Sequence, residues 1–207
     1  VVAVRDGDRK QHEPPEDIGS DYYPQIGLYS SNAEPDLDAH MRHLRRARVG
    51  VIALSWWGQA DFTDAVVSKV LDAAQRHGIK ASFHIEPFRG RNAQTTKEAI
   101  RYLIDTYGAH PAFYRDPSRG NRPMFFVYDS YLTPASEWAT VLRPGGDDSL
   151  RGTAHDAIVI GLWVKKGDGY FMVEGHFDGY YTYFATDGFT FGSTAANWKT
   201  LASFARE

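Results

Sequence analysis

The sequence predicts an α/β fold in which parallel strands alternate with helices. Short apolar runs begin near residues 49, 79, 124, 157 and 177, and helical apolar spacing with cap signals separates them. Strands that alternate with helices pair in parallel through right-handed crossovers. Five visible strands fit either a doubly wound open sheet or part of a (β/α)₈ barrel, which needs eight strands and about 250 residues.

The helices are expected from apolar spacing and from residues that start or stop helices. Leu37, Met41 and Leu44 recur at helical spacing, and Gly78 suits a position just past a helix end. Thr95 with Glu98 has the pattern of a capping box, and Pro134 suits a first helical turn. The expected helices cover residues 35–48, 63–78, 95–108, a stretch from 133, a short one near 171–172, and 193–206.

The strands are expected over residues 49–57, 79–88, 124–131, 157–164 and 177–184. The first of these, from Val49 to Trp57, is almost wholly apolar, as a strand buried on both faces is. Residues 1–34 look irregular, because Pro14 and Pro15 exclude a helix interior or a central strand there. We therefore divide the chain into an irregular segment, 1–34, and a β/α domain, 35–207.

Composition excludes several classes of protein. The chain has 23 Lys and Arg against 26 Asp and Glu, a net charge of −3, which argues against a general nucleic-acid binder. It contains no cysteine, so a disulfide scaffold, a thiolate zinc site and a cysteine nucleophile are excluded. No apolar run is long enough to span a membrane, and the first residues lack the pattern of a signal peptide. No glycine-rich phosphate loop follows any strand.

The candidate site lies where the strands end, because ligands bind at the carboxyl ends of parallel strands. His84 and Glu86 are two residues apart, so they share one face of their strand. Three interpretations stay open: a pair that satisfies itself, a metal pair that lacks a third ligand unless His176 supplies it, or a ligand-contacting pair. Tyr128 and Asp129 should point to opposite faces, and Asp129 could instead cap the next helix.

The remaining strand ends are rich in aromatic side chains. Of Trp56 and Trp57, one should face the ligand side and one a helix, whereas Tyr181 and Tyr183 should share a face. Aromatic faces stack on sugar rings, and His, Tyr and acid groups hydrogen-bond to hydroxyls. Glycoside cleavage needs two carboxyl groups, and only Glu86 is a good inward candidate. These residues alone predict a sugar-binding α/β protein that could be a glycosidase.

Several segments of the chain resemble glycoside hydrolase family 99, which contains endo-α-1,2-mannosidase and bacterial endo-α-mannanase. The match runs in one order from about residue 9 to the end. The segments that carry it are PPEDIGSDYYPQIGLYSS, HMRHLRRARVGVIALSWW, FHIEPFRGR, IDTYGAHPAFYR, FFVYDSYLTP and FDGYYTYFATDGFTFGSTAANW. The resemblance implies a (β/α)₈ TIM barrel, incomplete here with about five to six β/α units.

The resemblance also implies a function: retaining, endo-acting cleavage of α-mannosidic links in N-glycans or mannans. The substrate's own 2-hydroxyl would act as nucleophile, assisted by one carboxylate base and one carboxylic acid, with no metal or other cofactor. The family's two catalytic glutamates lie in a late motif similar to FNEWHEGTQIE, which this sequence lacks. The resemblance therefore implies a supporting role for Glu86, and substrate contacts for Trp56, Trp57, His84, Tyr128, Asp129, Tyr181 and Tyr183.

Two functions therefore remain open: a hydrolase seen as a partial chain, and a non-catalytic carbohydrate-binding remnant of the same fold. In either case the partner is an α-mannose-containing oligosaccharide or polysaccharide. We expect this chain alone to hydrolyse no α-mannoside. A barrel that lacks strands has two open sheet edges and an uncovered, apolar inner face. We therefore expect further chain, a second chain, or weak stability.

Overall fold

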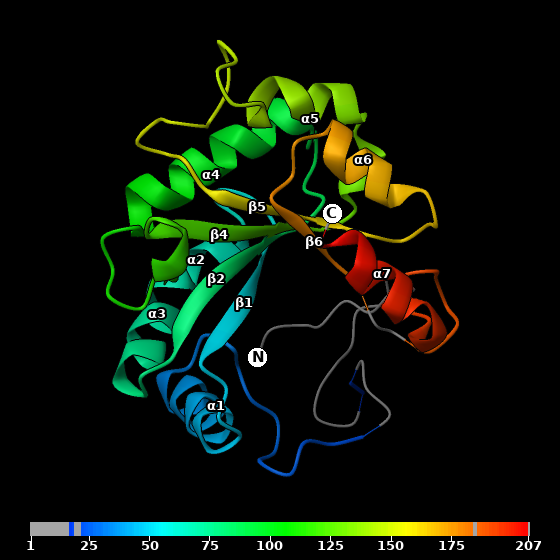
Figure 1. Ribbon diagram of the computed structural model, residues 1–207. Helices are drawn as coiled ribbons and strands as arrows, with labels where there is room; N and C mark the ends of the chain where they lie inside the picture. The colour runs from blue at the N-terminus through cyan, green and yellow to red at the C-terminus, as the bar shows by residue number, and fades with distance from the viewer. Residues whose placement is uncertain (1–16, 19–21, 184–185, 207) are drawn as a thin grey trace.

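The computed structural model describes residues 17–18, 22–183 and 186–206. Five parallel strands form a curved sheet in the order β1-β2-β4-β5-β6, and the helices lie along its outer face (Figure 1). The strands are β1 (Val51–Trp56), β2 (Lys80–Ile85), β3 (Arg115–Asp116), β4 (Arg122–Val127), β5 (Ile158–Leu162) and β6 (Gly179–Tyr181). The helices are α1 (Glu34–Arg46), α2 (Phe62–Ala65), α3 (Val67–Arg76), α4 (Ala93–Tyr107), α5 (Ala135–Leu142), α6 (Asp168–Glu174) and α7 (Trp198–Phe204), with 3₁₀ turns η1 (Pro117–Arg119), η2 (Ser130–Leu132) and η3 (Ala195–Asn197).

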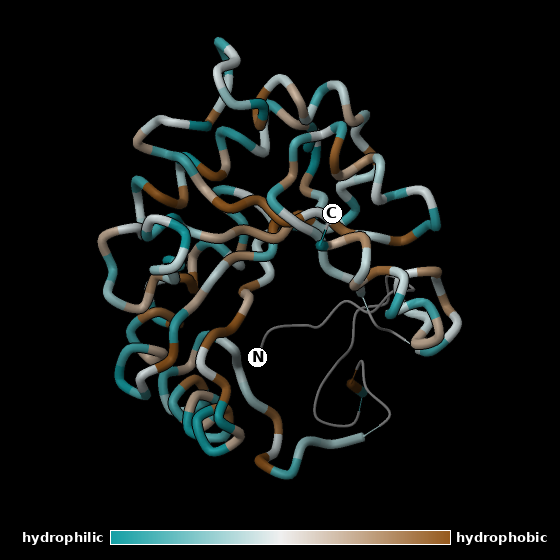
Figure 2. Tube along the Cα trace, in the orientation of Figure 1, coloured by the Kyte–Doolittle hydropathy of each residue, from teal (hydrophilic) through white to brown (hydrophobic). Residues whose placement is uncertain are grey.

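The predicted alternation of strands and helices is confirmed, and the described residues form five β/α units. The core lies between the sheet and the helices, where Phe83, Ile85 and Phe125 are fully buried. Figure 2 shows hydrophobic residues along the strands and hydrophilic residues on the outer turns of the helices, most clearly in α1. No helix in the part of the chain that the structure describes is long and apolar enough to cross a membrane.

The helix starts differ from the predicted ones, because side chains other than the expected ones cap them. Asn92, not Thr95, caps α4: its Oδ1 accepts from the Thr95 amide at 2.8 Å, and Thr95 Oγ1 accepts from the Asn92 amide at 2.9 Å. Thr95 is therefore the third helical residue of a capping box that begins three residues earlier. Likewise Asp61, not Thr63, caps α2. The helix predicted here is interrupted at Val66, which separates α2 from α3.

Further element boundaries were wrong as well. The helix expected from Thr133 begins at Ala135, with Pro134 in the capping position. The helix expected from Ser193 begins at Trp198, because the Ser193 hydroxyl accepts from the Thr190 amide at 2.7 Å and holds a turn instead. All strands are shorter than predicted, and the end of the last one falls partly on residues 184–185, outside the described residues. The two-residue strand β3, antiparallel to β4, is too short to give a periodic signal.

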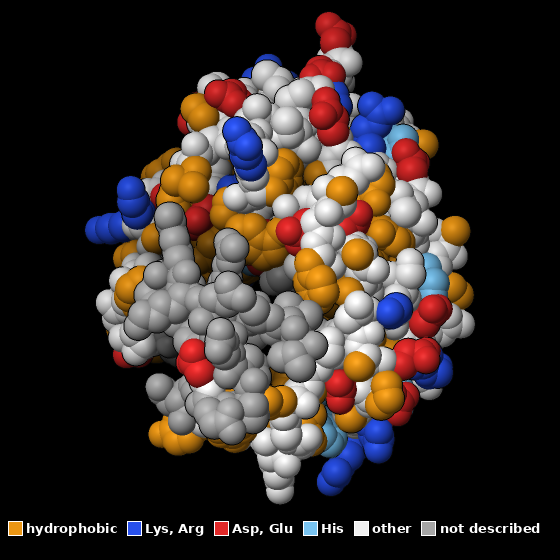
Figure 3. Space-filling model, turned by 180° about the vertical axis from the view of Figure 1, so that it is seen from behind, with side chains coloured by type: hydrophobic (Ala, Val, Ile, Leu, Met, Phe, Trp, Pro, Cys, Tyr) orange, Lys and Arg blue, Asp and Glu red, His pale blue; other side chains and the backbone are white. Residues whose placement is uncertain are grey.

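The inner face of the sheet carries both apolar and polar residues. Along β1 the residues that face the helices alternate with exposed residues on the inner face, namely Val51, Ala53 and Ser55. On β2 the inner face carries Lys80 and His84. Among the described residues β1 and β6 each pair on one side only, so the sheet has two open edges as predicted. Figure 3 shows the side of the molecule opposite to that in Figure 1, where most of the visible Lys and Arg side chains lie toward the margins of the view.

Candidate sugar-binding site at the carboxyl ends of the strands

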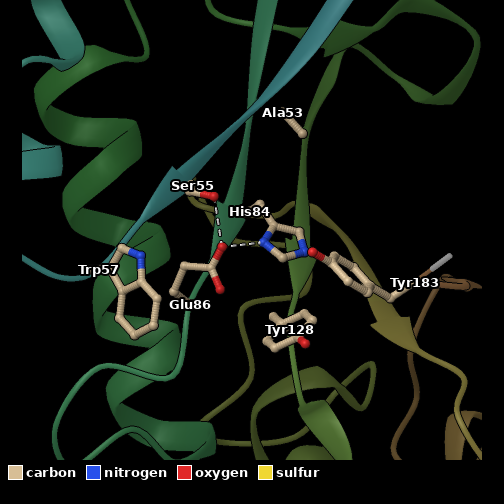
Figure 4. A pocket seen from close by; sticks show the side chains of 7 residues that line it. All are labelled: Ala53, Ser55, Trp57, His84, Glu86, Tyr128 and Tyr183. Carbon is tan, nitrogen blue, oxygen red and sulfur yellow. Dashed lines mark hydrogen bonds and ion pairs between the residues drawn. The ribbon is translucent and has the colours of Figure 1, made fainter. Parts of the chain in front are cut away.

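A pocket of about 440 Å³ lies on the inner face, where β1, β2 and β4 end (Figure 4). We call it the rim pocket. The parallel register places Ser55 beside His84, so side chains from neighbouring strands converge there. The side chains that line it are Ala53, Ser55, Trp57, His84, Glu86, Tyr128 and Tyr183.

Glu86 supplies the carboxylate of the rim pocket. Its Oε1 accepts hydrogen bonds from Ser55 Oγ at 2.8 Å and from His84 Nδ1 at 2.7 Å. The residue is only 7% exposed, yet Oε2 accepts no hydrogen bond from the described residues and is turned into the pocket (Figure 4). A carboxylate oxygen in this setting can accept a hydrogen bond from a ligand hydroxyl.

His84 links this carboxylate to a buried phenol. Its Nε2 lies 2.6 Å from the Tyr181 hydroxyl, while Nδ1 faces Glu86. Because an ionised carboxylate only accepts, the network assigns a proton to Nδ1, and a neutral imidazole then accepts from Tyr181 at Nε2. Burial raises the pKa of Tyr181, so its hydroxyl stays protonated and able to donate. The predicted sharing of one face by His84 and Glu86 is confirmed.

Aromatic rings form the walls of the rim pocket. The Trp57 side chain is 47% exposed, although its backbone amide is fixed by donating to Thr63 Oγ1 at 2.9 Å. The Tyr128 ring centroid lies 5.4 Å from that of His84 and 5.2 Å from that of Tyr183. An exposed indole and a clustered phenol pair on one concave surface suit stacking on a flat ligand face.

Trp56 has a different place from its neighbour and does not line the rim pocket. It is 2% exposed and faces the helices, where its indole Nε1 donates to Asp64 Oδ1 at 2.9 Å. Tyr102 donates to Asp64 Oδ2 at 2.8 Å, and the Ala60 amide donates to the same oxygen at 3.2 Å. The Asp64 carboxyl thus holds the turn that follows Trp57, and Trp56 is one of its anchors.

Asp129 also lies outside the lining of the rim pocket, and it does not cap a helix with its side chain. It adopts a left-handed backbone with φ +48°, and its Oδ1 accepts from the Tyr131 hydroxyl at 2.8 Å. The predicted divergence of Tyr128 and Asp129 is therefore present, with Tyr128 on the pocket side. The Tyr pair is similar: Tyr181 faces inward to His84, whereas Tyr180 packs on Trp163 on the helix side.

Ser55 is the contact that sequence reasoning left out. It stands two residues before Trp57 and therefore on the same strand face, which is the signal that could have found it. His176, weighed as a metal ligand, lies in the turn before β6, and its carbonyl accepts from Arg151 at 3.2 Å. Across the described ranges no three His, Cys, Asp or Glu side chains gather so as to hold a metal ion.

Parallel strands backed by helices, with a carboxylate, an imidazole and aromatic rings at their carboxyl ends, form the kind of site that binds sugars. The comparisons with known proteins give the family. The model of glycosyl hydrolase family 99 matches residues 2–207, and the chain belongs to that family.

Its relatives include glycoprotein endo-α-1,2-mannosidase of Rattus norvegicus, 44% identical over 202 residues, which are 94% of this chain and 44% of that protein. A human glycoprotein endo-α-1,2-mannosidase-like protein is 44% identical over 204 residues, 95% of this chain and 45% of that one. The chain thus spans less than half the length of these relatives. The solved GH99 endo-α-mannosidase from Bacteroides thetaiotaomicron is 46% identical with a TM-score of 0.87, over 92% of this chain and 56% of that structure. The fold is therefore an incomplete (β/α)₈ barrel.

Proposed function

We propose that residues 35–207 form the substrate-binding part of a retaining endo-α-mannosidase that cleaves α-mannosidic links in N-glycans or mannans. The single observation that carries this proposal is the Glu86 carboxylate, held at Oε1 and open at Oε2 beside the exposed Trp57 indole. A mannose ring would stack on Trp57 while its hydroxyls bond to Glu86. The names of the relatives and the family membership support the choice of mannose.

Glu86 is proposed to contact the sugar in a supporting role, not to carry out the acid–base chemistry alone. Glycoside cleavage needs two carboxyl groups across one bond, and Glu86 is the only carboxylate among the described residues that line the rim pocket. The late FNEWHEGTQIE-like motif, to which the family resemblance assigns the catalytic glutamates, is absent from this sequence. For this reason the experiments below also test the second candidate function, a carbohydrate-binding protein without catalysis.

The test is calorimetric titration of this chain with an α-1,2-linked manno-oligosaccharide. We expect the affinity to fall at least about tenfold in Glu86→Gln, which removes a charged hydrogen bond to the ligand. We expect a similar fall in Trp57→Ala, which removes a stacking face. Trp198→Ala is the matched control, because Trp198 on α7 is 49% exposed and does not line the rim pocket. Equal losses in all three variants, or no binding at all, would contradict the proposal.

Turnover separates the two candidates. Product from the same oligosaccharide is expected only when a polypeptide carrying the late glutamate motif is present. A protein that binds without turnover even then would be a carbohydrate-binding remnant. Turnover by this chain alone would show that Glu86 does more than contact the sugar.

A further inference from the structure

Arg91 is a half-buried cation behind the rim pocket that the site described so far leaves unused. Its guanidinium donates to three main-chain carbonyls at the ends of β2 and β4. Nη1 donates to Ile85 O at 3.3 Å and to Tyr128 O, and Nη2 donates to Asp129 O at 2.9 Å. Arg91 does not line the rim pocket.

These carbonyls lie where the strand pairing ends. The β2–β4 register stops at Ile85 with Val127, and the Tyr128 amide donates to Ile85 O at 3.1 Å. Beyond this point a strand carbonyl needs another donor. Arg91 provides it from a fixed, planar fork that can serve several acceptors together, whereas a lysine ammonium has no such fork. The backbone of Tyr128 is therefore held on both sides, by its amide and by its carbonyl.

The backbone turns sharply after Tyr128. Asp129 has φ +48°, a left-handed conformation that favours glycine and that Asp adopts only occasionally. The turn persists because Asp129 O accepts from both Arg91 Nη2 and the Leu132 amide, the latter at 3.1 Å. This turn lets the chain leave the sheet immediately after Tyr128, so that the Tyr128 ring faces His84 and Tyr183.

We infer that Arg91 is a positioning residue, which locks the left-handed turn at Asp129 and so fixes the Tyr128 wall of the rim pocket. Its contribution to sugar binding rests on the proposed function, but its effect on the turn does not. Two measurements separate the effect on the turn from the effect on sugar binding. The first is amide hydrogen exchange without any ligand, and the second is titration with the α-1,2-linked manno-oligosaccharide.

In Arg91→Met we expect the exchange of the Tyr128 and Leu132 amides to rise about tenfold or more, while the Phe125 amide in the middle of β4 stays unchanged. Arg91→Lys should give a smaller rise, because it keeps the charge but loses the fork. In an Asp129→Gly background, where the left-handed turn carries no strain, Arg91→Met should raise exchange at Leu132 by at most about threefold. The matched control is Arg101→Met, at an exposed position on α4, which should change none of these amides.

In the titration with the manno-oligosaccharide, we expect the affinity to weaken about tenfold in Arg91→Met. The affinity should recover in part when Asp129→Gly is added. Two results would overturn the inference: exchange at Tyr128 and Leu132 equal to that of the Arg101→Met control, or a uniform rise throughout β4, which would make Arg91 a general stability residue. If the unsubstituted chain binds no mannoside, the proposed function fails, and the exchange arm still decides the role of Arg91.

Discussion

The two ends of the sheet use similar residues for opposite purposes. At the amino ends of β4, β5 and β6, Arg151 donates to Asp178 Oδ2 at 2.7 Å, and the Val159 amide donates to the same oxygen at 2.8 Å. Arg122 lies 3.8 Å from the other Asp178 oxygen. At the carboxyl ends, Glu86 has one oxygen held and one turned into the rim pocket. The first carboxylate is satisfied within the protein, and the second is available to a ligand.

Each end also contains an arginine that donates to main-chain carbonyls. Arg151 donates to Leu142 O at 3.0 Å and to His176 O at 3.2 Å, and Arg91 serves the carbonyls at the ends of β2 and β4. A guanidinium in this setting joins elements whose backbone groups have no strand partner. The two arginines differ in what they hold. Arg151, at the amino ends, holds turns between elements, whereas Arg91, at the carboxyl ends, holds segments whose side chains line the rim pocket.

The largest expected effect tests the amino end. Arg151→Met leaves the half-buried Asp178 without its closest cationic partner and several carbonyls without a donor. We expect the free energy of unfolding to fall by about 3 to 5 kcal/mol, measured by urea denaturation. Mannoside affinity per folded molecule should not change. A large loss of affinity in the folded fraction would show that the two ends are coupled.

A somewhat smaller loss of stability is expected when Asp64, which anchors the turn after Trp57, is replaced. Asp64→Ala leaves the buried Trp56 indole N–H without an acceptor and releases the turn after Trp57, so stability should fall by about 2 to 3 kcal/mol. Mannoside binding should weaken as well, because the Trp57 indole is no longer held. Asp72→Ala removes an exposed carboxylate from α3 and is the control, expected within about 0.5 kcal/mol of the parent. Equal effects of the two substitutions would contradict this role for Asp64.

The smallest effect concerns pH and the turn at Asp129. Burial, with the hydrogen bond to Asp129, raises the pKa of Tyr131 to about 12. The folded state therefore favours the neutral phenol, and the stability this provides is present below pH 10 and lost as pH rises toward 12. Tyr131→Phe should lessen the alkaline loss of stability between pH 10 and 12, followed by urea denaturation at each pH. An unchanged pH profile would refute the contribution of Tyr131.

The site was predictable as far as strand periodicity reaches. His84 and Glu86 were placed on one face because side chains alternate along a strand, and Tyr181 and Tyr183 were placed on one face for the same reason. The same rule said that only one of Trp56 and Trp57 faces the ligand side, but it could not say which. Burial against Asp64 and Tyr102 decided that, through contacts distant in sequence. Strand periodicity also places Ser55 on the face of Trp57, but its hydrogen bond to Glu86, 31 residues away, is visible only in the folded chain.

The sequence by itself determined the parallel α/β order, the family and the strand ends where the pocket lies, because hydrophobic periodicity and local motifs are written within single segments. Only the tertiary structure decided the left-handed turn at Asp129 and the open oxygen of Glu86. These features depend on hydrogen bonds between segments that meet only after folding, such as Arg91 with Tyr128 and Asp129. Local propensity is too weak to fix them without those partners.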